Sequence, residues 1–188
     1  METDEKHNNY FVYFNFFVFS MLMLVMSSNF LVMFIGWELV GLSSYLLISF
    51  WSKKTAAAKA GNKAFILNRV GDFGFLIGLM LILNTFNTFD FYTVLKNASG
   101  VPENTITLIT LFLLLGAFGK SAQFPLFSWL PDAMEGPTPA SALIHAATMV
   151  TAGVFMLVRI SPILQHSKIA GMVIISFGLL TALLAAFS

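Results

Sequence analysis

The stretch LLLGAFGKSAQFPLF, residues Leu113–Phe127, places a lysine inside an apolar run long enough to lie within a membrane. Lys120 is followed five residues later by Pro125. A proline in a helix lacks a backbone N–H and clashes with the carbonyl four residues earlier, here that of Ser121. The stretch therefore predicts a helix broken near Pro125, with a cation beside the break. Carbonyls freed at a helix C-terminus favour positive charge, and a membrane tolerates them only where protein or water satisfies them.

The composition is that of an integral membrane protein. Of 188 residues, 57% are hydrophobic and 10% are charged, whereas soluble domains carry about 25% charged residues. The net charge of +1 predicts no nucleic-acid partner. There is no cysteine, which excludes disulfides and thiolate-held zinc or iron–sulfur clusters, and the three histidines lack metal-ligand spacing. We expect no metal site and no cofactor in this chain.

Apolar segments of about 20 residues recur along the chain, which is the length that crosses a bilayer. They predict an all-α, polytopic membrane bundle of about six helices, one of them broken. We expect a polar tail over residues 1–9 and a single membrane domain over 10–187. The predicted spans are 10–28, 29–50, 63–84, 104–130 (broken near Pro125), 137–160 and 168–187.

Lysines set the predicted orientation. Lys53, Lys54, Lys59 and Lys63 cluster between the second and third spans, and the positive-inside rule places that cluster on the inner side. The N-terminus then lies on the same side, and the loop over residues 87–104 lies on the other.

Four ionisable groups are expected at membrane depth: Glu38, Asp72, Lys120 and His145. Each costs about 2.5–3.5 kcal/mol at the centre of a spanning helix, so they favour a position inside the bundle where they offset one another. Structural interpretations remain open. Glu38 could pair with a basic residue for folding alone, Asp72 could pair with Arg69 three residues away, and His145 could be a core histidine bonded to a carbonyl.

Three motifs carry a resemblance: FIGWELVGLSSYLLI (Phe34–Ile48), NRVGDFGF (Asn68–Phe75) and GKSAQFPLFSWLPDAMEGPTPASALIHAATMVTAGVF (Gly119–Phe155). They resemble the antiporter-like subunit 5 family of the proton-pumping NADH:ubiquinone oxidoreductase, respiratory complex I. The resemblance implies two inverted repeats of five helices, each with a lysine on a broken helix. The six spans look like the first repeat plus one helix, roughly a third of the family's usual length, so we expect a fragment or a split subunit.

The resemblance also implies the site. Glu38 and Lys120 match the glutamate–lysine pair of the family, His145 matches the histidine that leads to the central hydrated path, and Asp72 matches an acidic residue that modulates the pair. The implied activity is proton translocation driven by quinone reduction elsewhere in the complex. NADH, FMN, iron–sulfur clusters and ubiquinone would be bound by other subunits. The implied partners are the chain that completes subunit 5, the adjacent antiporter-like subunit 4 and membrane lipid, in the mitochondrial inner membrane or, alternatively, a bacterial or thylakoid membrane.

Other functions stay open at this point. A subunit of a multisubunit sodium/proton antiporter would share the lysine and the break, although Thr151 stands where such subunits often place a lysine. A chloroplast-type NDH complex would differ in compartment and electron donor. A structural membrane spacer would use the charges only for pairing.

Overall fold

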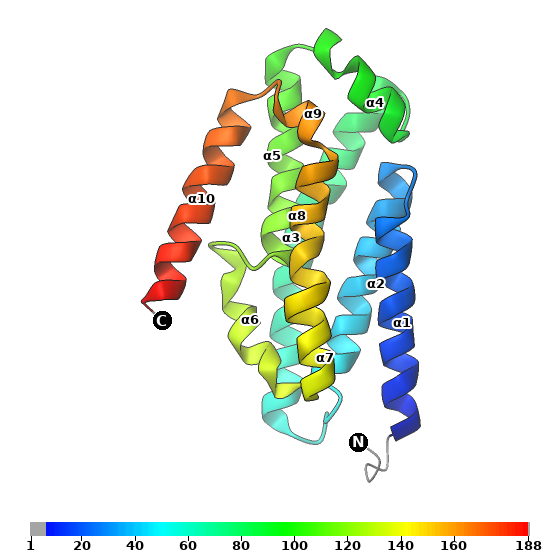
Figure 1. The fold of residues 1–188 in the computed structure, drawn as a ribbon, viewed down its shortest axis with the longest axis vertical. Coiled ribbons are helices and arrows are strands. Elements are labelled where there is room, and N and C mark those ends of the chain that lie inside the picture. Colours follow the sequence, from blue (N-terminus) through cyan, green and yellow to red (C-terminus); the bar gives the residue numbers. More distant parts are fainter. Residues whose placement is uncertain (1–6, 188) are drawn as a thin grey trace.

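The computed structural model describes residues 7–187, and this part of the chain is helical, with one isolated β-bridge between Asn29 and Asp90. The predicted all-α class is confirmed. The long helices run antiparallel to their chain neighbours (Figure 1). They are α1 (His7–Val25), α2 (Phe30–Ile48), α3 (Thr55–Phe86), α5 (Glu103–Lys120), α8 (Met149–Arg159) and α10 (Lys168–Ala186).

Short elements connect the long helices. At one end lie α4 (Phe91–Asn97), η1 (Ala98–Gly100) and α9 (Ser161–Leu164). Between the break and α8 lie η2 (Leu126–Ser128), α6 (Trp129–Asp132), η3 (Ala133–Glu135), α7 (Thr138–Ala142) and η4 (Leu143–Ala147), of which η4 is a π-helical turn leading into α8.

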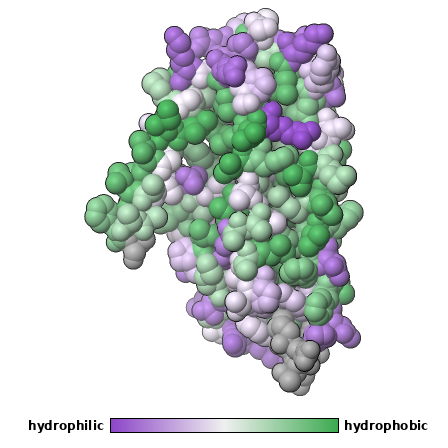
Figure 2. All heavy atoms as spheres, in the orientation of Figure 1, coloured by the Kyte–Doolittle hydropathy of each residue, from purple (hydrophilic) through white to green (hydrophobic). Residues whose placement is uncertain are grey.

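Six helical segments within the described residues are long and apolar enough to cross a membrane, with Thr138–Arg159 counted as one. This confirms the predicted six-helix membrane bundle. Figure 2 shows the expected surface: hydrophobic residues form a broad middle zone and hydrophilic residues gather at both ends. The N-terminal end of α1 and the lysine cluster lie at one end of the bundle, opposite α4 (Figure 1).

Several boundaries differ from the predicted ones. α1 begins at His7, so residues 7–9 of the predicted tail are helical, and residues 1–6 lie outside the described part. α3 begins at Thr55, eight residues before the predicted start, because the sequence TAAAKAGNKA is rich in alanine, the strongest helix former. Lys59 therefore lies on a helix, where a loop was predicted, and Lys63 lies well inside the helix rather than at its start.

Small residues let α3 and α5 pack closely. A Cβ on Gly71 would lie 3.1 Å from the Cα of Gly119, and one on Gly116 would lie 2.9 Å from the Cβ of Phe75. Small residues at such positions allow membrane helices to approach one another. This close contact brings one face of α3 directly against the last turns of α5, where Lys120 lies.

The last helix, α10, leans away from the bundle (Figure 1). It contacts α5 mainly through an apolar cluster in which Phe177 stacks on Phe118 with ring centroids 5.1 Å apart. The rest of its surface is mostly exposed and apolar, as is usual for a helix surrounded by lipid or by further protein.

Candidate functional site

The break in the fourth span lies at the end of α5, before Pro125. Ser121 caps the helix, Ala122 has the left-handed φ of 47°, and Gln123 N–H donates to the carbonyl of Phe118 at 2.9 Å. Ala122 N–H donates to Gly119 O at 3.4 Å, which completes a Schellman motif. The predicted position near Pro125 is thus corrected by about one turn: the chain has already left the helix when it reaches the proline.

Donors from neighbouring elements satisfy the polar groups around the break. Trp129 Nε1 donates to Gly119 O at 3.0 Å, and Gln123 Nε2 donates to Ser121 O at 3.0 Å. Ser121 Oγ donates to Val150 O at 2.7 Å, which ties the break to α8. The backbone of Phe124 donates to Thr181 Oγ1 of α10 at 3.0 Å. An irregular backbone at membrane depth is stable only with such partners.

Lys120 and Asp72 form a buried ion pair at the break. Lys120 is fully buried at the end of α5, and its Nζ lies 3.5 Å from Oδ2 of Asp72 on α3. The side-chain exposures are 0% and 4%, so neither charge is exposed at the surface of this chain. A buried charge needs a partner of this kind, because removing it from water costs several kcal/mol.

Residues of α2 contact this pair and leave space for it. Trp37 Nε1 donates to Asp72 Oδ1 at 2.7 Å, and the Lys120 Nζ lies 5.9 Å from the centre of the Trp37 ring. One turn further along α2, a Cβ on Gly41 would lie 2.8 Å from Lys120 Nζ. A larger residue at this position would require the ammonium group to shift.

Among residues 7–187, Glu38 forms an ion pair with Arg69 and Lys120 forms one with Asp72, so the Glu38–Lys120 pairing that the resemblance implied is not present. The guanidinium of Arg69, on α3, also lies 4.7 Å from the Phe65 ring centre. Successive residues of a helix point about 100° apart. Since Trp37 faces Asp72, its neighbour Glu38 faces the adjacent side of α3, where Arg69 lies. The predicted alternative of an Arg69–Asp72 pair is also wrong.

His145 lies on the π-helical turn, apart from the ion pair. Neither ring nitrogen has a hydrogen-bond partner among the described residues, although both are buried. Its ring meets that of Trp129 edge-on at 6.2 Å between centroids. Trp129 therefore contacts both His145 and, through Gly119 O, the last turn of α5. π-helical turns occur frequently at functional sites.

Trp37 and Trp129 were not predicted as site residues from the sequence. The usable signal was the indole itself: a buried tryptophan N–H nearly always needs an acceptor. In the motif GWELVG, Trp37 lies beside the acidic residue that the resemblance singles out, and the bonding partner is Asp72, 35 positions away.

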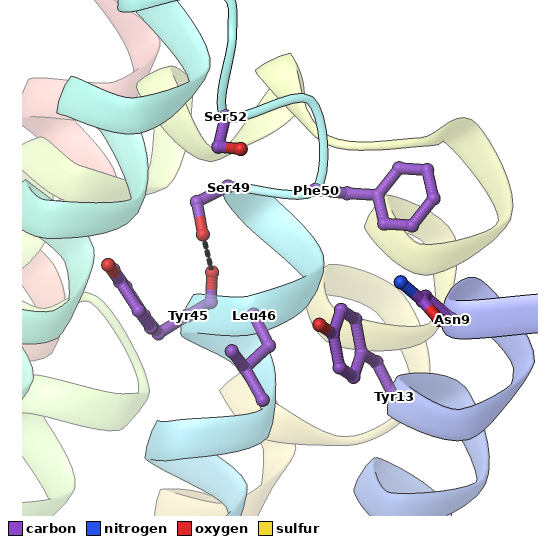
Figure 3. A pocket seen from close by; sticks show the side chains of 7 residues that line it. All are labelled: Asn9, Tyr13, Tyr45, Leu46, Ser49, Phe50 and Ser52. Carbon is purple, nitrogen blue, oxygen red and sulfur yellow. Dashed lines mark hydrogen bonds between the residues drawn. The ribbon is translucent and has the colours of Figure 1, made fainter. Parts of the chain in front are cut away.

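A small cavity of about 220 Å³ lies at the lysine-rich end, between α1 and the end of α2. Figure 3 shows Asn9 and Tyr13 of α1 on one side of the pocket and Tyr45 and Leu46 of α2 on the other, with the hydroxyl of Ser49, directly after α2, donating to the carbonyl of Tyr45. None of the four predicted site residues lines it. Among residues 7–187, no group of three His, Asp or Glu side chains is arranged to hold a metal ion.

Comparison with known proteins identifies a matching family and relatives of this chain. The profile of the family described as "NADH:quinone oxidoreductase/Mrp antiporter, TM" matches residues 27–188. NADH-ubiquinone oxidoreductase chain 5 of Rhizopus stolonifer is 56% identical over 186 residues, covering 99% of this chain and 28% of the relative. NADH-quinone oxidoreductase subunit L of Neisseria meningitidis is 53% identical over 198 residues, covering 98% and 29%.

A solved structure of the Mrp complex from Dietzia sp. has the same fold. It matches with a TM-score of 0.91 and 31% identity, covering 96% of this chain and 20% of that chain. The chain spans less than a third of the length of the curated relatives named above, 28% of one and 29% of the other.

Proposed function

The chain belongs to the NADH:quinone oxidoreductase/Mrp antiporter transmembrane family, and from this we propose that it is a proton-translocating segment of the membrane arm of respiratory complex I. The observation that carries the proposal is the fully buried Lys120 at the end of a broken membrane helix, with Asp72 as its partner at 3.5 Å. Ionisable residues inside membrane bundles mark proton and ion pathways, and broken helices mark the sites where those ions bind.

The Lys120–Asp72 pair has the chemistry of a proton-carrying element. Burial disfavours the charged form of a lysine, and a nearby carboxylate favours it. The readiness of Lys120 to release a proton therefore depends on how close Asp72 lies. The separation of 3.5 Å is longer than a tight charge-assisted hydrogen bond of about 2.7–2.9 Å, which leaves room for the pair to tighten or to open.

Glu38 and His145 extend this site in two directions. Glu38 follows Trp37 on α2, and Trp37 bonds Asp72. The Glu38 carboxylate forms a salt bridge with Arg69 on a neighbouring face of α3. His145 has two buried ring nitrogens without partners among residues 7–187, so it is suited to bond a water molecule and pass on a proton. We assign both to the proton path, with Lys120 and Asp72 at its centre.

The remaining parts of the reaction belong, in this proposal, to other chains. NADH, FMN, iron–sulfur clusters and ubiquinone bind elsewhere in the complex, and quinone reduction drives the proton movement. The partners are the rest of subunit 5, the adjacent antiporter-like subunit 4 and membrane lipid. The location is the mitochondrial inner membrane, in line with the 56% identity to the Rhizopus stolonifer chain.

Sodium/proton antiport is the second candidate, favoured by the structural match to the Mrp complex. The two functions differ in what accompanies the chain during purification. A complex I segment co-purifies with NADH oxidation that acidifies a vesicle lumen independently of sodium. Sodium-dependent transport without NADH oxidation would favour the antiporter.

A structural spacer is tested by neutralising the charges while keeping the packing. The double variant Asp72→Asn/Lys120→Met, made in the full-length subunit, removes both charges of the buried pair at once. We expect proton pumping in the assembled complex to fall at least tenfold, with assembly retained. Lys96→Met, on α4 at the end of the bundle, is the matched control and is expected to pump normally. Normal pumping by the double variant would favour a spacer.

A further inference from the structure

We propose that Trp37 is a positioning residue for the ion pair: its indole N–H fixes the Asp72 carboxylate so that Oδ2 always faces Lys120. This inference rests on the proposed proton-translocating function and assigns a role to a residue that does not itself exchange a proton. The tryptophan is completely buried, and its Nε1 donates to Asp72 Oδ1 at 2.7 Å.

The two oxygens of Asp72 have different partners. Oδ1 accepts the short hydrogen bond from Trp37 on α2, whereas Oδ2 faces Lys120 on α5 at 3.5 Å. An indole N–H is a donor only and does not titrate in the physiological range. The bond to Oδ1 therefore persists whether Lys120 is charged or neutral.

Packing holds the indole in the orientation that this role needs. The Phe75 ring of α3 meets the Trp37 ring edge-on, with centroids 5.1 Å apart and an interplanar angle of 80°. On the other side, the Trp37 ring lies 5.9 Å from Lys120 Nζ, so the same side chain bonds the carboxylate and faces the cation. Gly41, one turn along α2, leaves the space in which the ammonium group lies.

The surrounding charges leave Trp37 as the fixed partner of Asp72. From α5, Lys120 faces the carboxylate. From α2, Glu38 is engaged by Arg69, the charged residue one turn before Asp72 on α3 itself. Among residues 7–187, only Lys120 forms an ion pair with Asp72, and only Trp37 and Lys120 donate hydrogen bonds to its side chain. When Lys120 is neutral, the Trp37 N–H remains bonded to Oδ1 of Asp72.

The test is Trp37→Phe in the full-length subunit within the assembled complex. Phenylalanine keeps an aromatic ring and loses the N–H. Because the carboxylate beside Lys120 loses the donor that orients it, we expect the pH profile of proton pumping to move by about one pH unit, which corresponds to about 1.4 kcal/mol. Trp51→Phe, in the turn after α2, is the control and is expected to keep the original profile. An unchanged profile in Trp37→Phe overturns the proposal.

A second measurement does not require Trp37→Phe to assemble. Ultraviolet resonance Raman spectra report hydrogen bonding of indole N–H groups. In Lys120→Met, we expect the Trp37 signal to keep its hydrogen-bonded position, because Asp72 still accepts the bond. A shift to the free N–H position would overturn the proposal. The two proposals fail separately: normal pumping by Lys120→Met contradicts the proposed function, whereas loss of pumping in Lys120→Met with an unchanged profile in Trp37→Phe contradicts only the role of Trp37.

Discussion

Lys120 Nζ lies 3.5 Å from Asp72 Oδ2, and this contact joins the end of a broken helix to the middle of an unbroken one. Both side chains are buried, and they come from α5 and α3, two helices that pack closely through glycines. The pair is thus held on the rigid face of α3 and on the terminal turn of α5, where the backbone changes direction.

Asp72→Asn is expected to destabilise the protein and to abolish pumping. The substitution leaves Lys120 buried without a counter-charge, and breaking a buried ion pair by removing one partner costs about 3–5 kcal/mol. The measurement is thermal unfolding of the assembled complex together with proton pumping. A loss of less than about 1 kcal/mol would contradict the burial and pairing of these groups.

The double variant Asp72→Asn/Lys120→Met separates stability from function. It removes both charges, so we expect most of the lost stability to return, since a buried pair is often no more stable than an apolar replacement. Pumping should remain absent. Recovery of pumping together with stability would mean that the charges serve folding alone.

Gly41→Ala is expected to disturb Lys120 directly. The added Cβ would lie 2.8 Å from Nζ, so the ammonium group must move from its place beside Asp72. We expect pumping to fall by about tenfold, the effect of losing about 1.4 kcal/mol of interaction. Gly171→Ala on α10 is the control, because a Cβ there meets no described atom within 4 Å. Equal effects of the two substitutions would contradict a specific role for the space at Gly41.

Ala122→Gly is expected to stabilise the break. Ala122 has a φ of 47°, a conformation that costs an L-residue roughly 1–2 kcal/mol and glycine almost nothing. We expect the free energy of unfolding to rise by about 1 kcal/mol, measured by thermal or denaturant unfolding. Ala182→Gly, within α10, should have the opposite sign because glycine weakens a helix interior. A stability loss in Ala122→Gly would contradict the Schellman geometry.

Asp90, outside the spanning helices, is expected to make α4 sensitive to acid. Its carboxylate accepts hydrogen bonds from the backbone N–H and hydroxyl of Thr93, each at 2.8 Å, and these bonds hold the pKa of Asp90 below its ordinary value of 3.8. A depressed folded pKa stabilises the helix start above the ordinary value. This contribution is lost as the pH falls below 3.8 through the folded pKa.

Hydrogen exchange at the Thr93 amide measures this effect. We expect its protection to decrease as the pH falls below 3.8. Asp90→Asn also caps helices well but does not titrate, so it should show much less pH dependence. The same acid-induced loss in Asp90→Asn would show that another group is responsible.

The long elements and the ionisable residues were predictable from the sequence, because spanning helices follow directly from hydropathy. Lys120, Asp72 and Glu38 lie in buried or partly buried positions of three helices, as their cost in a membrane implies. That the helix breaks was also predictable, since a proline disrupts the interior of a helix. The position of the break was not, because the Schellman turn at Ala122 is set by hydrogen bonds that precede Pro125.

The pairing of the charges could not be predicted from the sequence. Whether Lys120 meets Glu38 or Asp72 depends on the rotation of α2 against α3, and a rotation by one residue exchanges Trp37 for Glu38. That rotation is fixed by contacts distant in sequence, such as Phe75 against Trp37 and the room left by Gly41. For the same reason, the indole bond to Asp72 was visible only in three dimensions.

The most direct test of the central claim is the number of protons translocated per NADH oxidised, measured in vesicles with Lys120→Met in the full-length subunit and the complex fully assembled. Methionine keeps the length and apolar stem of lysine and removes the group that carries the proton. We predict that this ratio falls while the complex remains assembled and still oxidises NADH. A ratio equal to that of the unmodified complex would contradict the assignment of Lys120 to the proton path.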